Sequence, residues 1–249
     1  MEIKIDKVAF RIFGIDIMWY AIIILTGVMF GLYVANKNAK LRNIEEDEIS
    51  NLLFFALPIS VIGARIYYVI FEWENYKGNF ISMINIREGG LAIYGAVIAS
   101  VIVVYFFSKK KNINVRDLLD VCAPGLILGQ AIGRWGNFVN QEAHGTETDL
   151  PWAVIIEGKK YHPTFLYESL GNFLIFGFLM IYMRKYQKKK GEIILLYAIL
   201  YGGLRFFVEG LRTDSLMFLG LRISQVVSVI GVLVGVILFV LNRKYGKDI

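Results

Sequence analysis

Seven long apolar segments limit the folds open to this chain more than any other feature. They lie at residues 17–36, 50–71, 91–108, 118–138, 165–184, 192–210 and 222–242. A helix needs about 20 mostly apolar residues to cross the hydrocarbon core of a bilayer. We therefore predict an all-α integral membrane protein, a polytopic bundle of about seven transmembrane helices that forms one domain over residues 1–249.

Composition excludes a soluble globular protein. Hydrophobic residues make up 56% of the chain and charged residues 19%, and the mean hydropathy is +0.54. A soluble domain is nearer half apolar and a quarter charged. The net charge of +6 is typical of basic cytoplasmic loops that face anionic lipid, and no basic run interleaved with aromatic residues indicates nucleic-acid binding.

Loop charge predicts the orientation of the spans. The segments 37–49, 109–117, 184–191 and 243–249 carry 15 Lys and Arg residues, whereas the alternate, longer segments carry nine. Because cytoplasmic loops are enriched in Lys and Arg, the N-terminus is predicted outside and the C-terminus in the cytoplasm. The longest outer connection, about 139–164, forms a small loop region that could hold a strand pair or a short interfacial helix.

The chain has few residues that could form a disulfide, bind a metal or carry a covalent intermediate. It has one cysteine, Cys122, in an apolar stretch near the predicted cytoplasmic start of the fourth span, and two histidines, His144 and His162. A zinc site needs more ligands of these types than the chain provides. We expect no metal and no cofactor.

Polar side chains from five spans reach a common depth in the outer half of the predicted bundle. At about 1.5 Å per residue, Arg65 lies about 22 Å up its span, and Arg205 and Glu209 lie about 20–26 Å up theirs. The same level is reached by three further groups, which are Tyr20 in the first span, Tyr94 in the third, and Arg134 with Asn137 at the end of the fourth.

Each of these residues also has a structural explanation. Tyr20 could belong to an aromatic belt, and Arg65 could extend to the outer headgroups. Arg205 and Glu209 share a helix face at i, i+4 with Tyr201 and could neutralise each other. Glycine pairs such as Gly129 with Gly133 and Gly231 with Gly235 are typical of close helix packing.

Together, however, the charges indicate an anion site. Three intramembrane arginines exceed the one carboxylate counted inside the spans, Glu209, so a net positive site is predicted. The common anion at that level is a lipid phosphate, whose oxygens fit the planar guanidinium fork. Arg134 is interpreted as half of a phosphate clamp, to which Asn137 and Asn140 add neutral donors.

The stretch GRWGNFVNQEAHG, residues 133–145, resembles the signature of the prolipoprotein diacylglyceryl transferases. Five further stretches agree with that family in order, so the similarity covers essentially the whole chain. They are MWYAI (18–22), GARIYYVIF (63–71), EGGLAIYGAVI (88–98), HPTFLYES (162–169) and YGGLRFFVEGLR (201–212).

The resemblance implies a reaction, substrates and a location. A diacylglyceryl group moves from phosphatidylglycerol to the lipobox cysteine thiol of a preprolipoprotein signal peptide, and a thioether forms as glycerol phosphate leaves. This is the first step of bacterial lipoprotein maturation, at the outer leaflet of the cytoplasmic membrane. The matching positions for phosphatidylglycerol binding are Arg134, Arg205, Arg65, Asn137, Asn140, Glu142, Gly145, Tyr20 and Tyr201.

The chain departs from the family at one position. Family members often carry a histidine after the third-span glycines, proposed as a base for the thiol, and Tyr94 stands there in this chain. A neutral tyrosine is a poor base near pH 7, because its reference pKa is about 10. His144 and His162 lie in the predicted outer loop.

The catalytic residues implied are Arg134, Arg205, Tyr94, Glu209 and Asn137. The arginines would stabilise the departing phosphate, and Glu209 would orient Arg205. The competing class is a non-enzymatic transporter or translocating protein for anionic lipid, which could use the same arginines. Such a protein should show repeated halves with broken spans and sites near the midplane, and the sequence shows neither.

Overall fold

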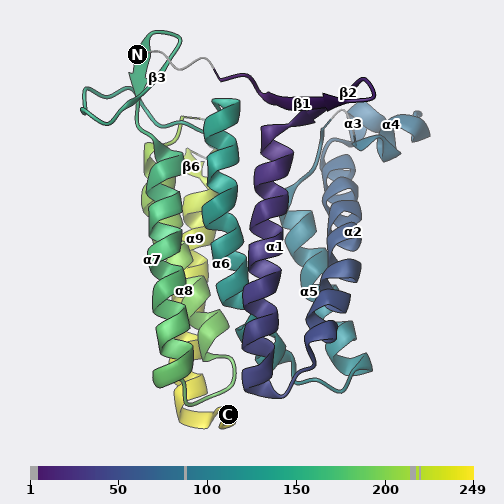
Figure 1. Ribbon diagram of the computed structural model, residues 1–249, viewed down its shortest axis with the longest axis vertical. Coiled ribbons are helices and arrows are strands. Elements are labelled where there is room, and N and C mark those ends of the chain that lie inside the picture. Colours follow the sequence, from purple (N-terminus) through teal and green to yellow (C-terminus); the bar gives the residue numbers. More distant parts are fainter. Residues whose placement is uncertain (1–4, 87–88, 214–216, 219) are drawn as a thin grey trace. The chain divides into compact units, whose positions relative to one another are not determined.

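The computed structural model describes residues 5–86, 89–213, 217–218 and 220–249, and long helices dominate it (Figure 1). The long helices are α1 (Trp19–Ala39), α2 (Glu46–Phe71), α5 (Ile93–Lys110), α6 (Val115–Asn140), α7 (Thr164–Lys185), α8 (Glu192–Leu211) and α9 (Ile223–Tyr245). The short ones are α3 (Trp73–Tyr76), α4 (Phe80–Ile84) and the 3₁₀ helix η1 (Lys40–Arg42).

The predicted all-α membrane fold is confirmed. Every predicted span coincides with one long helix, and within the described part of the chain six of these helices are long and apolar enough to cross a membrane. The exception is α6, which forms the predicted fourth span as one continuous helix but includes Asp117, Asp120 and Arg134. These charges explain why α6 is the least apolar of the seven.

Short antiparallel hairpins precede α1 or lie between later helices. They pair β1 (Val8–Ile12) with β2 (Ile15–Met18), β3 (Val154–Ile156) with β4 (Lys159–Tyr161), and β5 (Met217–Phe218) with β6 (Leu221–Arg222). In the β3–β4 hairpin, Val154 pairs with Tyr161 and Ile156 with Lys159. Of the two structures considered for the 139–164 loop, the strand pair is therefore the one that forms.

The chain divides into two compact units. The first comprises Met1–Ala35 and Asp120–Ile249, and the second comprises Asn36–Leu119. The first unit holds most of α1 and α6 and all of α7, α8 and α9. The second is built on α2 and α5. Whether the chain acts as a single domain stays a prediction.

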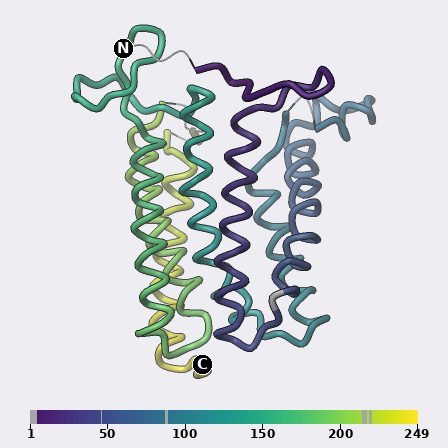
Figure 2. Tube along the Cα trace, in the orientation of Figure 1, coloured from purple at the N-terminus to yellow at the C-terminus, as the bar shows by residue number. Residues whose placement is uncertain are grey.

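The core of the first unit lies where α6, α7 and α8 meet. Its buried side chains are Ala123, Ile127, Ile175, Leu179, Met183 and Ile193. Helix α9 packs along α8, and α8 along α7, as the green and yellow traces show (Figure 2). In this unit, α6 and α8 end, and α7 begins, on the same side, near the β3–β4 hairpin. Residues at these helix ends can therefore meet.

Glycines bring α1 close to α6. A Cβ atom at Gly31 would lie 2.7 Å from the carbonyl oxygen of Gly125, and one at Gly27 would lie 3.0 Å from that of Gly129. The predicted packing role of Gly129 is confirmed, although its partner lies on α1. The Gly231 and Gly235 pair behaves differently, because Gly235 packs on Ile199 while Gly231 faces open space.

A buried carboxylate fixes the opposite end of α6. Asp120 accepts hydrogen bonds from the side chain of Gln187 at 2.7 Å and from the backbone N–H groups of Gly191 and Ile194 at 2.6 and 3.0 Å. The last two donors belong to the start of α8, where helical N–H groups lack partners within the helix. Asp120 therefore caps α8 from a neighbouring helix.

The second unit rests on close packing of α2 against α5. A Cβ atom at Gly63 would lie 2.8 Å from the carbonyl oxygen of Gly95. The hydroxyl groups of Ser60 and Ser100 are 2.7 Å apart, which adds a hydrogen bond between the two helices. The backbone N–H of Ala92 donates to the Ala64 carbonyl and so joins the start of α5 to α2.

The α1–α6 contact predicts opposite effects for two glycine substitutions. Gly31→Ala should lower the midpoint of thermal unfolding in detergent by several degrees, because the new methyl group meets backbone that cannot yield without separating the helices. Gly177→Ala on α7 is the matched control, since no atom lies within 4 Å of the new Cβ. It should leave the midpoint unchanged or raise it, because alanine is the better helix former. Equal midpoints for the two variants would contradict the predicted close packing.

Candidate active site

The last turns of α6 present the arginine and asparagine of the 133–145 motif on one helix face. Arg134 and Asn137 are three residues apart, and helical residues at that spacing are neighbours. The Nη1 atom of Arg134 donates to Oδ1 of Asn137 at 3.5 Å. The guanidinium group therefore extends toward the end of the helix.

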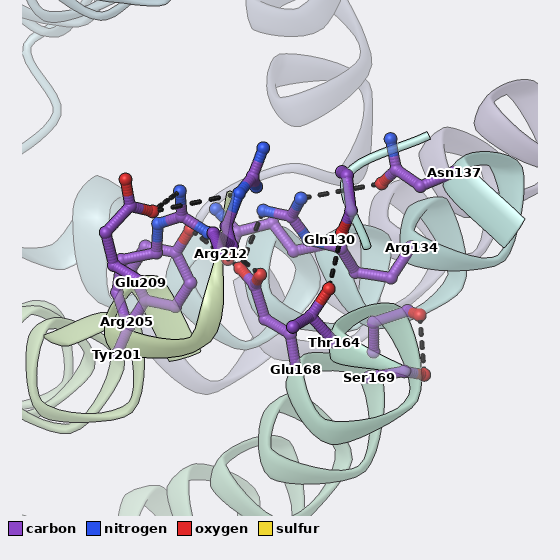
Figure 3. Close-up of polar contacts among 12 residues, drawn as sticks. Gln130, Arg134, Asn137, Thr164, Glu168, Ser169, Tyr201, Arg205, Glu209 and Arg212 are labelled. Atoms are coloured by element: carbon purple, nitrogen blue, oxygen red, sulfur yellow. Dashed lines mark hydrogen bonds and ion pairs between the residues drawn. The ribbon is translucent and has the colours of Figure 1, made fainter. Parts of the chain in front are cut away.

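A carboxylate on α7 joins two arginines from separate helices. One oxygen of Glu168, Oε1, lies 2.6 Å from Nη2 of Arg134, and the other, Oε2, lies 3.1 Å from Nη1 of Arg205. Figure 3 shows the two guanidinium groups on either side of this carboxylate. The predicted convergence of Arg134 and Arg205 is thus present in the structure.

The face of α8 extends the cluster. Nη2 of Arg205 also forms an ion pair with Glu209 one turn along the helix, and Nε of Arg212 lies 3.9 Å from the same carboxylate (Figure 3). The backbone carbonyl of Glu209 accepts from Nη1 of Arg222 at 2.6 Å. Glu209 therefore holds Arg205 from the side opposite Glu168.

The prediction that Glu209 is the one carboxylate within the spans is wrong. Asp120, Glu168 and Glu192 also lie within the predicted spans. Because Glu168 lies at the arginines, Arg134, Arg205 and Arg212 face two carboxylates rather than one. The carboxylates are buried, with side chains 2% exposed, whereas those of Arg134 and Arg205 are 22% and 16% exposed. One positive charge remains in excess, and the accessible part of the cluster is positive.

Two tyrosines flank the cluster. The hydroxyl of Tyr201 donates to Oε1 of Glu168 at 3.3 Å, and its ring stacks on that of Tyr197. Tyr20 lies in the first turn of α1 and packs on α6, where a Cβ atom at Gly136 would lie 2.7 Å from its ring. Both predicted tyrosines of this unit therefore lie against helices that carry the arginines.

The motif continues into a tight turn after α6. The side-chain amides of Asn137 and Asn140 donate to Oε1 of Glu142 at 2.9 and 3.4 Å. Gln141 and Ala143 adopt positive φ angles of 56° and 55°, which is uncommon for residues other than glycine. Both amides predicted to face a phosphate thus donate to Glu142.

Gly145 holds this turn against the end of α8. Its backbone forms an antiparallel bridge with Arg212, and its N–H donates to the carbonyl of His162 at 2.9 Å. A Cβ atom at this position would lie 2.6 Å from that of His162. The structure thus explains Gly145 by close backbone packing.

A cavity of about 250 Å³ opens beside the turn. The polar side chains that line it come from the end of α6 and the residues after it, and the apolar ones come mainly from β3 and the start of α7. The lining residues are Ile5, Asn137, Phe138, Gln141, Glu142, His144, Ala153, Val154, Ile155, Ile156 and Phe165. Asn137 lines the cavity and also accepts a hydrogen bond from Arg134, so the cavity adjoins the arginine cluster.

The second unit contains two further predicted residues. Arg65 is buried, and its guanidinium donates to the carbonyls of Ser82, Met83, Gly89 and Gly90 at 2.6–2.9 Å. These bonds use four of the five guanidinium N–H groups. The carbonyls therefore occupy most of the donors that a phosphate would need.

Tyr94 lies in the first turn of α5. Its ring centroid is 6.4 Å from that of Tyr67 on α2. Glu88, the first residue of the stretch 88–98 that resembles the family, lies outside the described residues.

Neither a metal cluster nor a nearby thiol accompanies the arginines. In the portion of the chain that the structure describes, no three His, Cys, Asp or Glu side chains are grouped as metal ligands would be. Cys122 precedes Arg134 on α6 by twelve residues, which corresponds to about 18 Å along the helix.

Sequence analysis missed Glu168 as a member of the site, although a signal was present. The residue lies inside the span predicted at 165–184, and a charged residue within a span usually faces the bundle interior. Because Glu168 lies near the end of that span, it was not counted among the intramembrane charges. Its contacts with α6 and α8 link residues 34 and 37 positions away, which spacing within one helix cannot show.

Comparison with known proteins connects this geometry to one family. The family model described as prolipoprotein diacylglyceryl transferase matches residues 7–241. Three relatives are each named phosphatidylglycerol–prolipoprotein diacylglyceryl transferase. The one from Finegoldia magna is 58% identical over 98% of this chain and 97% of its own length. Those from Clostridioides difficile and Streptococcus suis are 49% and 45% identical over 98% of this chain, and over 98% and 94% of their own lengths. The chain therefore belongs to the prolipoprotein diacylglyceryl transferase family.

Proposed function

We propose that this chain transfers the diacylglyceryl group of phosphatidylglycerol to a cysteine thiol of a prolipoprotein. The observation that carries the proposal is the shared carboxylate of Glu168, which holds Arg134 and Arg205 with their guanidinium groups partly exposed. Relatives that match along nearly their whole length bear the name of this activity.

The arrangement of charge suits a phosphate. A buried carboxylate fixes each guanidinium from the inner side, while the accessible side retains positive charge. Arginine binds phosphate oxygens through parallel N–H donors, and such bonds are stronger than neutral ones. A phosphate that approaches Arg134 and Arg205 would also neutralise the excess positive charge.

The reaction is a displacement at the glycerol carbon that carries the phosphate ester. The cysteine thiolate attacks this carbon, a sulfur–carbon bond forms, and the carbon–oxygen bond to phosphate breaks. The electron pair of the broken bond leaves on glycerol phosphate, and the thiol proton passes to a base. The two arginines stabilise the charge that develops on the departing phosphate.

The other residues position these groups. Glu168 and Glu209 orient Arg205, and Tyr201 supports Glu168. Asn137 links Arg134 to the Glu142 turn, which Asn140 also supports. Tyr20 and Gly136 form a further contact between α1 and α6, which we propose as one wall of the lipid site.

In the second unit, we propose that Tyr94 hydrogen-bonds the ester or the thiol. Arg65 binds the backbone carbonyls of Ser82, Met83, Gly89 and Gly90, which precede α5 in the chain. The location we propose is the bacterial cytoplasmic membrane, with the N-terminus outside and the site at the outer leaflet. The excess of Lys and Arg in the alternate loops supports this orientation.

One assay separates a transferase from an anionic-lipid transporter. Vesicles of phosphatidylglycerol with a labelled glycerol backbone are mixed with the protein and a lipobox peptide. A transferase moves the label onto the cysteine as a thioether. A transporter redistributes the lipid and leaves the peptide unlabelled, and that outcome would refute the proposal.

Arg205→Lys tests whether the planar guanidinium group of Arg205 is needed to bind the phosphate. Lysine keeps the charge but lacks the planar fork whose separate nitrogens reach Glu168 and Glu209, so thioether formation should fall by about 100-fold. Arg184→Lys is the matched control, since Arg184 lies at the other end of α7 and its Nη1 donates to the Met180 carbonyl. The control should keep wild-type activity. Full activity of Arg205→Lys would exclude the proposed role.

Glu168→Gln separates positioning from binding. The neutral side chain keeps its shape but frees positive charge, so kcat should fall at least about tenfold while the KM for phosphatidylglycerol does not rise. Steady-state rates over a range of lipid fractions in vesicles measure both constants. A raised KM with an unchanged kcat would show that Glu168 serves lipid binding alone.

Tyr94→Phe removes one hydroxyl and keeps the ring that contacts Tyr67. If that hydroxyl holds the ester or the thiol, the rate of thioether formation should drop about tenfold while thermal stability is retained. An unchanged rate would assign Tyr94 to packing.

A further inference from the structure

The cavity beside the Glu142 turn contains a histidine that the mechanism above does not use. His144 lies two residues after Glu142, and its ring packs on Tyr161 of β4 with centroids 4.3 Å apart. It is partly buried and lines the cavity. The transfer reaction needs a proton acceptor for the thiol, and no residue in the mechanism above supplies one.

The tautomer of His144 follows from its contact with the backbone. Its Nδ1 atom is 3.2 Å from the carbonyl oxygen of Gly145. A carbonyl oxygen only accepts hydrogen bonds, so Nδ1 of the neutral ring carries the proton and donates. The basic lone pair then lies on Nε2, as a general base requires.

The cavity lies next to Arg134, which we propose to bind the phosphate. Asn137 lines it and accepts a hydrogen bond from Arg134. In a displacement, the nucleophile enters on the side of the carbon opposite the leaving group. A phosphate held at Arg134 would leave on the arginine side, and a thiol in the cavity would approach across Asn137.

The cavity walls suit a short peptide segment. The side chains from β3 and the start of α7 are apolar, whereas those of the turn are polar. Among the described strands, β3 pairs with β4 alone, and an extended peptide can add to the other edge of such a strand. An extended apolar segment that ends in a cysteine fits both features.

We propose that this cavity receives the cysteine-bearing segment of the protein substrate and that Nε2 of His144 accepts the thiol proton. The inference rests on the proposed transfer reaction. The S–H bond breaks as His144 becomes the imidazolium ion, and the thiolate then attacks the glycerol carbon while glycerol phosphate leaves. The proton returns to water after product departs.

The charged and titratable groups near His144 come from the turn itself and from the neighbouring elements. Glu142 shares the cavity, while Arg212, at the backbone bridge to Gly145, is directed to Glu209. The remaining groups on the neighbouring elements are Asp6 and Lys7 beside Ile5, Glu147 paired with Lys159, Glu157, Lys160, Tyr161 and His162.

The test is the pH profile of thioether formation by the full-length protein in phosphatidylglycerol vesicles with a lipobox peptide. His144→Asn keeps an amide that can donate to Gly145 but removes the base. The wild-type rate should fall on the acid side of the profile, where the base that accepts the thiol proton is itself protonated. In the variant this limb should move to about pH 8.5, where the substrate thiol ionises by itself.

The two rates should therefore differ at least about tenfold at pH 7 and converge near pH 9.5. His162→Asn is the matched control and should keep the wild-type profile, because His162 contacts Tyr167 and does not line the cavity. The pH at which the rate falls does not depend on the amount of folded protein, so a loss of folded variant cannot mimic the shift. An unshifted limb in His144→Asn would overturn the proposal. If the transfer reaction itself is wrong, the wild type and both variants form no thioether at any pH.

Discussion

The rest of the site depends on one carboxylate shared between two arginines. Two guanidinium groups from different helices repel each other unless a counter-charge lies between them, and Glu168 supplies it with one oxygen for each. Its burial requires both partners, since an unpaired charge in such a place is costly. Because the carboxylate approaches from within the bundle, the positive charge is left on the accessible side.

This arrangement requires helices α6, α7 and α8 to keep fixed positions along their axes. Close glycine contacts hold α1 against α6, and Asp120 ties α6 to the start of α8 at the opposite end. A slip of one turn would move a side chain by about 5.4 Å and break the shared ion pairs. Packing far from the arginines thus maintains the geometry of the site.

Much of the fold could be predicted from sequence, because the length and hydropathy of a span decide whether it forms a helix. Helical spacing predicted the shared face of Tyr201, Arg205 and Glu209. The similar heights of Arg134 and Arg205 along their spans predicted that these two residues converge. Depth does not give the rotation of a helix about its axis. The Glu168 bridge, the carbonyl contacts of Arg65 and the backbone junction at Gly145 all depend on such rotation or on loop geometry, so sequence analysis missed them.

The central claim is that Arg134 and Arg205 bind one lipid phosphate together. Solid-state NMR can measure dipolar coupling between the ³¹P nucleus of phosphatidylglycerol and ¹⁵N-labelled arginine side chains in vesicles. We expect coupling that corresponds to hydrogen-bonded contact, that weakens in Arg134→Lys and in Arg205→Lys, and that disappears when both are replaced. Coupling that survives the double replacement, or none in the wild type, would contradict the account.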